Sequence, residues 1–307
     1  MALVAMLVAG TFADYQIAQA VYTPSNPLGI FFSSLGLLPM AYPACFFLGV
    51  LVQRSLTNQK SQVLRIVGAV LCVVFAMAFG ALVTRALLSV RDGFGGMAGG
   101  ELPTMVRLGI GVAVGAGLCA FGYSAGKNND AKDLTRKLVI VLVALVASYA
   151  FIELVKNFIA RPRPFAVLAG YDGLEFCPWY QKSSGVKEFM ATFGLERDAF
   201  KSFPSGHSMQ AAAFLISFLG LSFVFPSLRE KLGIALAIEI VFTLAVMSCR
   251  MIVGAHFLSD VGVGALISVI AFLIVMKLNR DPYTAATHEQ EKTNEGTRIE
   301  LARGDKN

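Results

Sequence analysis

A histidine within a short run of small polar residues marks the stretch with the clearest potential for chemistry. This stretch, residues 201–208, lies between a long polar segment and an apolar one. Ser205 is expected to be the N-cap of a helix, with Gly206 and His207 in its first turn. The free N–H groups and positive dipole end of such a helix favour a phosphate, beside which His207 would carry a proton. An ordinary capped helix start would explain Ser205 and Gly206 equally well.

A second histidine lies four residues before an aspartate at the start of another apolar segment. His256 and Asp260 would share one helical face, where the carboxylate accepts a proton from the imidazole N–H. An Asp inside a membrane span costs roughly 2.5–3.5 kcal/mol on insertion scales, so it is expected to have a partner, and His256 is the nearest candidate. Arg250, at the end of the preceding apolar segment, adds a positive charge at the same level.

Two further cations lie near the end of an earlier apolar segment. Lys156 and Arg163 are seven positions apart, nearly two helical turns, so they share a side if the helix continues far enough. Basic side chains near span ends also commonly extend to the membrane interface, which is the alternative for Lys156. Glu153 is expected to be a local ion partner of Lys156. Glu239, in the middle of a later span, has no evident partner and is not assigned to the site.

The composition indicates a polytopic membrane protein. Of the 307 residues, 56% are hydrophobic and only 15% charged, whereas soluble domains carry about 25% charged residues. The net charge of +6 is explained by basic membrane loops, so no nucleic-acid partner is expected. The cysteines have no metal-type spacing, so neither a disulfide framework nor a metal site is expected, and no cofactor is implied. They are Cys45, Cys72, Cys119, Cys177 and Cys249.

The elements that must position these residues are all helices. We expect an all-α bundle of about eight membrane spans, with the active site at the extracytoplasmic ends of the helices. The expected spans are 1–12, 28 or 35 to 52, 63–88, 104–125, 138–159, 205–225, 232–249 and 256–276. The first lacks the charged start of a signal peptide and is therefore interpreted as a membrane helix. Residues 14–27 and 89–103 are expected to be loop or interfacial segments.

Residues 1–280 are predicted to form one integral membrane domain with a catalytic core at about 138–280. The remainder, 281–307, is polar and predicted to be a disordered cytoplasmic tail. Glycine pairs at four-residue spacing in the fourth span predict close helix contacts. These pairs are Gly111 with Gly115 and Gly122 with Gly126. Trp179 and Tyr180, in the long loop before Phe203, would anchor at the interface or form a lip at the site.

The distribution of basic residues predicts the orientation. The turns after the second, fourth, sixth and eighth expected spans are basic, whereas the segments 1–27 and 89–103 hold a single basic residue, Arg91. The positive-inside rule therefore places both termini in the cytoplasm and the ends that carry Lys156 and His207 outside. The long loop before Phe203 is also basic, although it faces outside. This exception requires a separate explanation.

The three groups of residues together resemble the signature of the type-2 phosphatidic acid phosphatase superfamily, which includes membrane lipid phosphatases and soluble vanadium haloperoxidases. The parts are Lys156-x6-Arg163-Pro164, Pro204-Ser-Gly-His207 and Cys249-Arg250-x5-His256-x3-Asp260, in the family's order and internal spacing. Cys249 departs from the family's usual Ser. It adjoins the phosphate-binding Arg250, so the departure affects fine phosphate contacts only.

The resemblance implies metal-independent hydrolysis of a lipid phosphate or polyprenyl diphosphate at the outer face of the cell membrane. His256 would be the nucleophile that forms a phosphohistidine, and Asp260 would orient its imidazole. His207 would protonate the leaving oxygen and then activate water. The phosphate-binding residues implied are Lys156, Arg163, Ser205, Gly206 and Arg250. These cations would supply the neutralisation that a metal provides elsewhere.

Three alternatives remain open. A phosphotransferase would share the phosphohistidine and pass the phosphoryl group to a lipid or sugar acceptor. A transporter would use the basic cluster to bind its substrate, but such sites lie near the bilayer midplane between related halves, which this chain lacks. An inactive lipid-binding homologue conflicts with the intact His207, His256 and Asp260. The lipid, whether phosphatidate, phosphatidylglycerophosphate or undecaprenyl diphosphate, the oligomeric state and any protein partners stay undetermined.

Overall fold

All regular secondary structure in the described part of the chain is helical. The computed structural model describes residues 1–58, 61–89, 94, 100, 102–127, 129, 131 and 133–279. The α-helices are α1 (Ala2–Val21), α2 (Pro27–Leu35), α3 (Leu38–Asn58), α4 (Gln62–Leu87), α5 (Thr104–Gly126), α6 (Leu134–Ile159), α7 (Pro164–Leu168), α8 (Val186–Phe193), α9 (Gly206–Ala212), α10 (Phe214–Val224), α11 (Leu232–Ile252) and α12 (Leu258–Leu278). Two short 3-10 helices are η2 (Arg197–Phe200) and η3 (Pro226–Lys231).

Eight segments of the described chain are long and apolar enough to cross a membrane, as the sequence predicted. They correspond to α1, α2 with α3, α4, α5, α6 with α7, α9 with α10, η3 with α11, and α12. The protein is therefore an all-helical, multi-pass membrane protein. The predicted tail, 281–307, lies outside the described residues, as does most of the expected loop 89–103.

The first helix is longer than the sequence suggested. We expected it to end at Phe12 and residues 14–27 to form a loop or interfacial segment, but α1 continues to Val21. Asp14 belongs to the buried face of α1, which packs against α12. The extension is stable because the Asp14 carboxylate pairs with Arg161 across this contact instead of facing lipid.

Other helix boundaries differ where the chain turns or caps a helix. The second span is divided between α2 and α3 at Gly36, and the sixth between α9 and α10 at Ala213. The fifth begins at Leu134. The last begins at Leu258. His256 was expected inside this helix, but it lies in the turn before it. The Asp260 side chain accepts from the N-cap backbone N–H, which fixes this later start.

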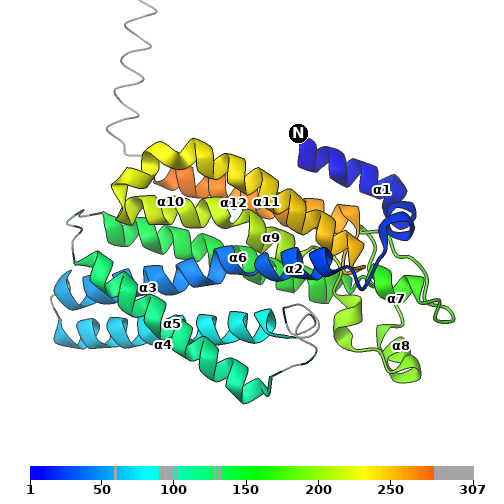
Figure 1. The fold of residues 1–307 in the computed structure, drawn as a ribbon, viewed down its shortest axis with the longest axis horizontal. Helices are drawn as coiled ribbons and strands as arrows, with labels where there is room; N and C mark the ends of the chain where they lie inside the picture. Colours follow the sequence, from blue (N-terminus) through cyan, green and yellow to red (C-terminus); the bar gives the residue numbers. More distant parts are fainter. Residues whose placement is uncertain are drawn as a thin grey trace, which may run out of the picture.

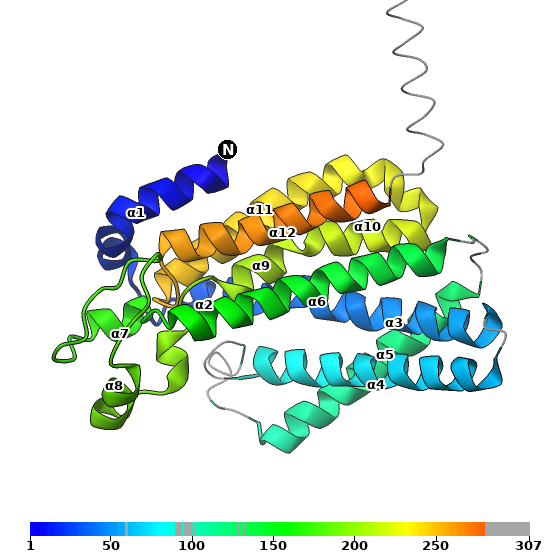
Figure 2. The same ribbon diagram turned by 180° about the vertical axis from the view of Figure 1, so that it is seen from behind.

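The bundle has two parts that lie side by side. Helices α3, α4 and α5 pack mainly on one another, whereas α6 and α9–α12 form the second part and meet α3 along its length (Figure 1; Figure 2, from behind). The predicted small-residue contacts are confirmed in the first part. A Cβ added at Gly111 would lie 2.5 Å from the Gly80 carbonyl oxygen of α4, and one added at Gly122 would lie even closer to the Phe46 carbonyl oxygen of α3. Close backbone approach thus replaces large side chains here.

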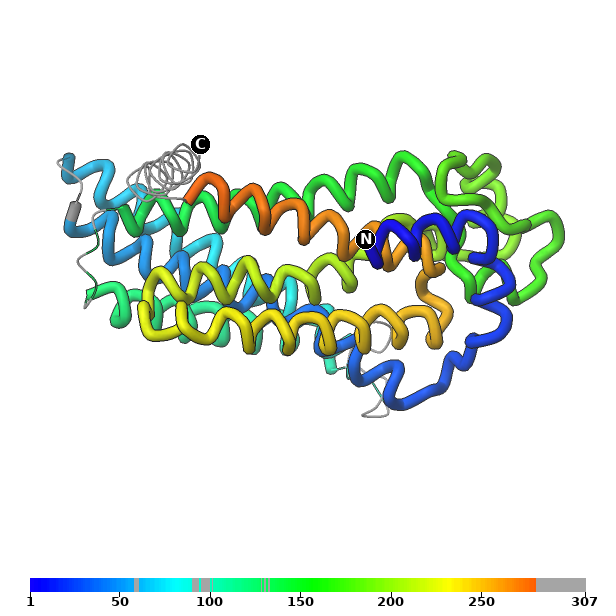
Figure 3. The backbone as a smooth tube through the Cα atoms, turned by 90° about the horizontal axis from the view of Figure 1, so that it is seen from above, coloured from blue at the N-terminus to red at the C-terminus, as the bar shows by residue number. Residues whose placement is uncertain are grey.

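The second part brings four helix ends to one level. The last residues of α6 and α11 lie beside the first residues of α9 and α12, and the segment between α6 and α9 covers this end of the bundle (Figure 1). Helix α1 runs along the starting half of α12 at the same end (Figure 3). The residues singled out in the sequence as chemically capable therefore meet here.

Candidate active site

The start of α9 has the capped geometry that the sequence predicted. Ser205 is the N-cap, and its Oγ accepts from the Ser208 backbone N–H at 3.3 Å and lies 3.0 Å from the Ser208 hydroxyl. The Ser205 N–H donates to the Asp260 carbonyl oxygen at 3.0 Å. The carbonyl of Ser205 also packs directly on Gly264 of α12. These contacts hold His207 in the first turn of α9 against the start of α12.

His256 occupies the turn between α11 and α12. Gly254 takes a positive φ of 72°, which closes the turn, and the N–H groups of Ala255 and His256 donate to the Arg250 carbonyl oxygen. The imidazole Nδ1 lies 2.7 Å from the Ser202 carbonyl oxygen. Because a carbonyl only accepts, Nδ1 carries the proton, and the lone pair of the neutral ring is on Nε2. Nε2 is buried and has no hydrogen-bond partner within the described residues.

Asp260 does not form the predicted hydrogen bond with His256. The Asp260 Oδ2 lies 3.9 Å from His256 Nδ1, and the Ser202 carbonyl takes the place that was expected for the carboxylate. The Asp260 carboxylate instead accepts from the Ser202 hydroxyl at 2.5 Å and the Phe257 N–H at 2.8 Å. Ser202 therefore links the two residues, since its hydroxyl contacts Asp260 and its carbonyl contacts His256.

A buried ionic network that the sequence analysis missed holds Asp260 from behind. Arg161 is fully buried and donates to Asp260 Oδ1 at 2.5 Å and Asp14 Oδ2 at 2.9 Å. Ser259 donates to Asp14 through both its backbone N–H and its hydroxyl, and Arg161 donates to the Ser259 hydroxyl at 2.9 Å. The guanidinium also lies 4.2 Å from the Phe257 ring centroid. We call Asp14, Arg161, Ser202, Ser259 and Asp260 the inner network.

Two features of the sequence could have pointed to this network. Asp14 is the one carboxylate among residues 1–27, and a carboxylate buried by a membrane helix is expected to have a partner. Arg161 is a second arginine two positions before Arg163. The partner of Asp14 is 147 residues away along the chain, so the pairing follows from the tertiary packing of α1 on α12.

The three predicted phosphate-binding cations come to the same end of the bundle. Lys156 Nζ lies 3.1 Å from where a Cβ on Gly206 would be, so the ammonium group lies against the start of α9. It is 3.4 Å from Glu153, the predicted local ion partner. Arg163 contacts Asp198 at 2.7 Å, and Arg250 is only 2% exposed. Lys156 and Arg163 are also largely buried.

The surroundings keep His256 neutral. Burial lowers the pKa of its imidazole well below the ordinary value of 6.5, and the positive charges of Arg163, Arg250 and Lys156 lower it further. These cations therefore lie close enough to act on His256 electrostatically. A neutral, buried imidazole with an unshared lone pair beside three cations is suited to attack an electrophilic centre that bears negative charge.

Other residues named from the sequence have structural partners away from His256. Glu239 accepts from the Thr243 hydroxyl at 3.2 Å within α11. Trp179 donates to the Thr11 hydroxyl at 3.0 Å and stacks on Phe203, so it ties the long loop to α1. All five cysteines are free thiols, and the described residues contain no group of three or more His, Cys, Asp or Glu that could hold a metal ion.

The fold and the site together define an integral membrane protein with a two-histidine, three-cation centre at one end of a helical bundle. Residues 137–283, just under half of the chain, match the family model of the PAP2 superfamily, which supports the predicted resemblance to type-2 phosphatidic acid phosphatases. No curated protein and no solved structure gives a match. The family match supports phosphatase-type hydrolysis of a lipid phosphate in the membrane. Asp14 lies outside the matched segment.

Proposed function

We propose that this protein hydrolyses a lipid phosphate or polyprenyl diphosphate at the outer face of the membrane through a phosphohistidine intermediate. The proposal rests mainly on the environment of the His256 Nε2 atom. This atom is buried, has no hydrogen-bond partner within the described residues, and belongs to a ring that burial and three nearby cations keep neutral. The reaction is assigned to the membrane domain over residues 1–280, with residues 281–307 as an accessory tail.

In the first half of the reaction, the lone pair of His256 Nε2 forms an N–P bond while the bond from phosphorus to the lipid oxygen breaks. Protonated His207 donates its proton to that leaving oxygen. Lys156, Arg163 and Arg250 balance the charge on the equatorial phosphate oxygens, together with the Ser205 hydroxyl and the Gly206 N–H. These steps account for the cations around an uncharged nucleophile.

In the second half, His207 takes a proton from water and the water oxygen attacks phosphorus. The N–P bond breaks, its electron pair returns to Nε2, and inorganic phosphate leaves. Asp260 acts through Ser202, because the Ser202 carbonyl fixes the Nδ1–H of His256 while its hydroxyl is held by the carboxylate. This arrangement keeps Nε2 as the reactive atom in both halves.

The charges of the loops support the proposed face of the membrane. Basic residues gather in the turns at the opposite end from His256, including Arg136, Arg229, Lys231 and Lys277, which favours a cytoplasmic position for that end. Both termini would then be cytoplasmic and the site would face outward. A substrate must place its phosphate at that surface while its chain stays in lipid, which a phospholipid or prenyl phosphate does.

The test uses the purified full-length protein in detergent with EDTA and a panel of lipid phosphates and diphosphates. We expect His256→Ala to lower phosphate release by more than about 1,000-fold, because the nucleophile is lost. His288→Ala, which changes the one histidine outside the expected membrane domain, is the matched control and should release phosphate normally. An acid-labile phosphoenzyme should form in wild type only. Undiminished release by His256→Ala would refute the mechanism.

A further inference from the structure

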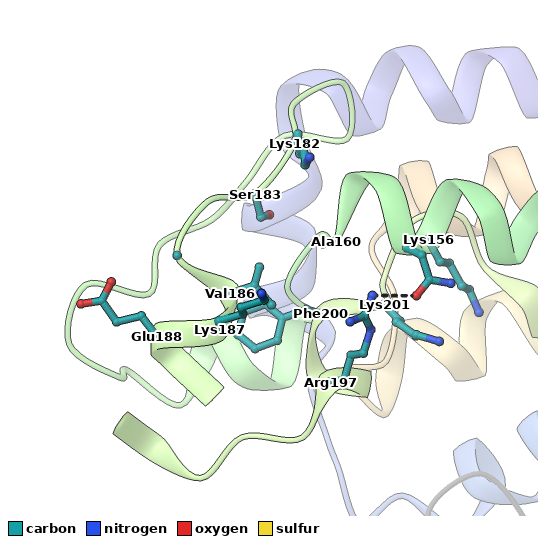
Figure 4. Close-up of a pocket in the computed structure, with 12 residues that line it drawn as sticks. Lys156, Ala160, Lys182, Ser183, Val186, Lys187, Glu188, Arg197, Phe200 and Lys201 are labelled. Atoms are coloured by element: carbon teal, nitrogen blue, oxygen red, sulfur yellow. Dashed lines mark hydrogen bonds between the residues drawn. The ribbon is translucent and has the colours of Figure 1, made fainter. Parts of the chain in front are cut away.

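Four basic residues of the long loop have no part in the proposed reaction. They are Lys182, Lys187, Arg197 and Lys201, and they belong to the segment whose positive charge broke the positive-inside pattern. All four line one cavity of about 440 Å³, which also has Lys156 in its wall (Figure 4). We call this the outer cavity. The loop therefore concentrates its unassigned cations beside the candidate active site.

The outer cavity has an excess of positive charge. Its lining includes five cations and one carboxylate, Glu188, which lies at the outer rim and points away from the basic groups (Figure 4). Lys156 and Lys201 share Glu153, each at 3.4 Å. Lys182, Lys187 and Arg197 form no ion pair with a carboxylate in the described part of the chain. A cavity with this balance attracts an anion.

The cavity has a folded wall. Phe200 is 1% exposed and packs with Ala166, Leu174 and Ala199 in a small core of the loop, which Val186 also contacts. Arg197 donates to the Asn157 side-chain oxygen at 3.0 Å, which ties η2 to the end of α6. The basic groups are thus held on a packed scaffold, so that a bound anion would not have to order the whole segment.

Lys156 belongs both to the lining of the outer cavity and to the candidate phosphate site. One side of this ammonium group faces Gly206 at the start of α9, and the same residue lines the cavity. A phosphate held by Lys156 and Arg163 for attack by His256 would therefore have the outer cavity beside it. A neighbouring acidic group on the same substrate would reach the four loop cations.

We propose that the outer cavity binds a second phosphate group of the substrate, next to the one that is hydrolysed. This inference rests on the proposed function and narrows it. The preferred substrates would be lipids that carry a diphosphate, or a phosphomonoester joined to a phosphodiester, and not lipids with a single phosphomonoester. A simple phosphomonoester would leave Lys182, Lys187 and Arg197 without an anion to bind.

The first experiment compares farnesyl diphosphate with farnesyl monophosphate, which share one chain. The variant is the triple substitution K182Q/K187Q/R197Q, and the matched control is R229Q/K231Q/K277Q, which removes three exposed charges at the opposite end of the bundle. We expect the cavity variant to lower kcat/KM for the diphosphate about 10-fold and that for the monophosphate less than about 2-fold, because each exposed charge contact contributes a few-fold at most. An unchanged ratio, or an equal fall in the control, would overturn the proposal.

A second measurement needs no turnover and separates this proposal from the proposed function. Calorimetry with the full-length His256→Ala protein would compare inorganic pyrophosphate with inorganic phosphate as probes. We expect pyrophosphate to bind about 10-fold more tightly, with the difference lost when K182Q/K187Q/R197Q is added. Equal binding of the two anions would reject the outer cavity even if wild type is active. Selective pyrophosphate binding by a protein that hydrolyses no lipid would reject the proposed function and retain the cavity.

Discussion

The inner network and the outer cavity differ in how their charged side chains are buried and paired. Arg161 and its two carboxylates, Asp14 and Asp260, are almost completely buried, and every one of these charges has a partner. The outer cavity gathers more cations than carboxylates and leaves most of them partly exposed. Lys156 and Arg163 lie between these extremes, because each is largely buried and pairs with a carboxylate that is itself partly exposed.

This difference separates a structural use of charge from a binding use. A buried ion must be paired, since removal of its partner leaves an uncompensated charge in an apolar interior. A fully paired group has little left to offer a ligand but fixes geometry well. An excess of one sign near the surface costs little in water and is available to a ligand of the opposite sign. The same loop thus positions the site with Arg161 and attracts anions with Lys182 and Lys187.

The largest effect is expected when the inner network loses its central cation. Arg161→Met should lower the free energy of unfolding by about 3–5 kcal/mol, because two buried carboxylates are left without their shared partner. Lys182→Met removes the same charge from the outer cavity and should change stability by less than about 0.5 kcal/mol. Unfolding in detergent, followed by heat or denaturant, measures both. Similar stability for the two variants would mean that the burial of the charge is irrelevant.

A smaller effect is expected when the outer partner of Arg161 is neutralised. Asp14→Asn leaves Arg161 with Asp260 alone, so the guanidinium and the linked Ser202 shift relative to His256. We expect kcat to fall about 10-fold, because small misplacements of reacting groups are costly, while KM changes little, since Asp14 does not face the substrate.

The control for this variant is Asp133→Asn, which removes a carboxylate paired with Lys137 at the other end of the bundle. It should leave kcat unchanged. A change in KM with kcat unaltered, or an equal loss of kcat in both variants, would show that Asp14 does not position the site. A normal phosphohistidine yield in Asp14→Asn with slow formation would separate positioning from simple misfolding.

The sequence predicted the architecture well because its signals are local. Eight apolar segments, the cap at Ser205 and the glycine contacts near Gly111 follow from composition and short spacing. The meeting of Lys156 with the start of α9 was also expected, since the span ends alternate between two levels. Such features need no knowledge of how distant segments pack.

The details around His256 were not predicted because they depend on distant contacts and on backbone atoms. The imidazole is oriented by the Ser202 carbonyl, and no side-chain pattern identifies a backbone acceptor. The four-residue spacing suggested a direct contact with Asp260, but His256 precedes the helix and its ring turns elsewhere. Asp14 was predicted in a loop or interfacial segment, but its partner Arg161 stabilises a longer helix.

The smallest effect expected is a shift in pH dependence that distinguishes charges near His256 from charges in the outer cavity. The charged and titratable groups that act on His256 are Arg163, Arg250, Lys156 and His207, with Asp260 at 3.9 Å. Because the pKa of His256 lies below 6.5, the neutral nucleophile persists as the pH falls through that value, and kcat/KM declines only at more acidic pH.

Lys156→Met removes one of the cations that lower this pKa, so the acidic limb of kcat/KM should move toward 6.5 by less than about one pH unit, on top of any loss in rate. Lys187→Met makes the same charge change at the outer cavity and should leave the acidic limb in place.

The free energy of unfolding should depend on pH through the same group. Below pH 6.5 the unfolded chain binds a proton that folded His256 does not, so acid lowers the free energy of unfolding, and less so in Lys156→Met. A limb that stays fixed in Lys156→Met, or moves equally in both variants, would show that the two groups of cations act on His256 alike.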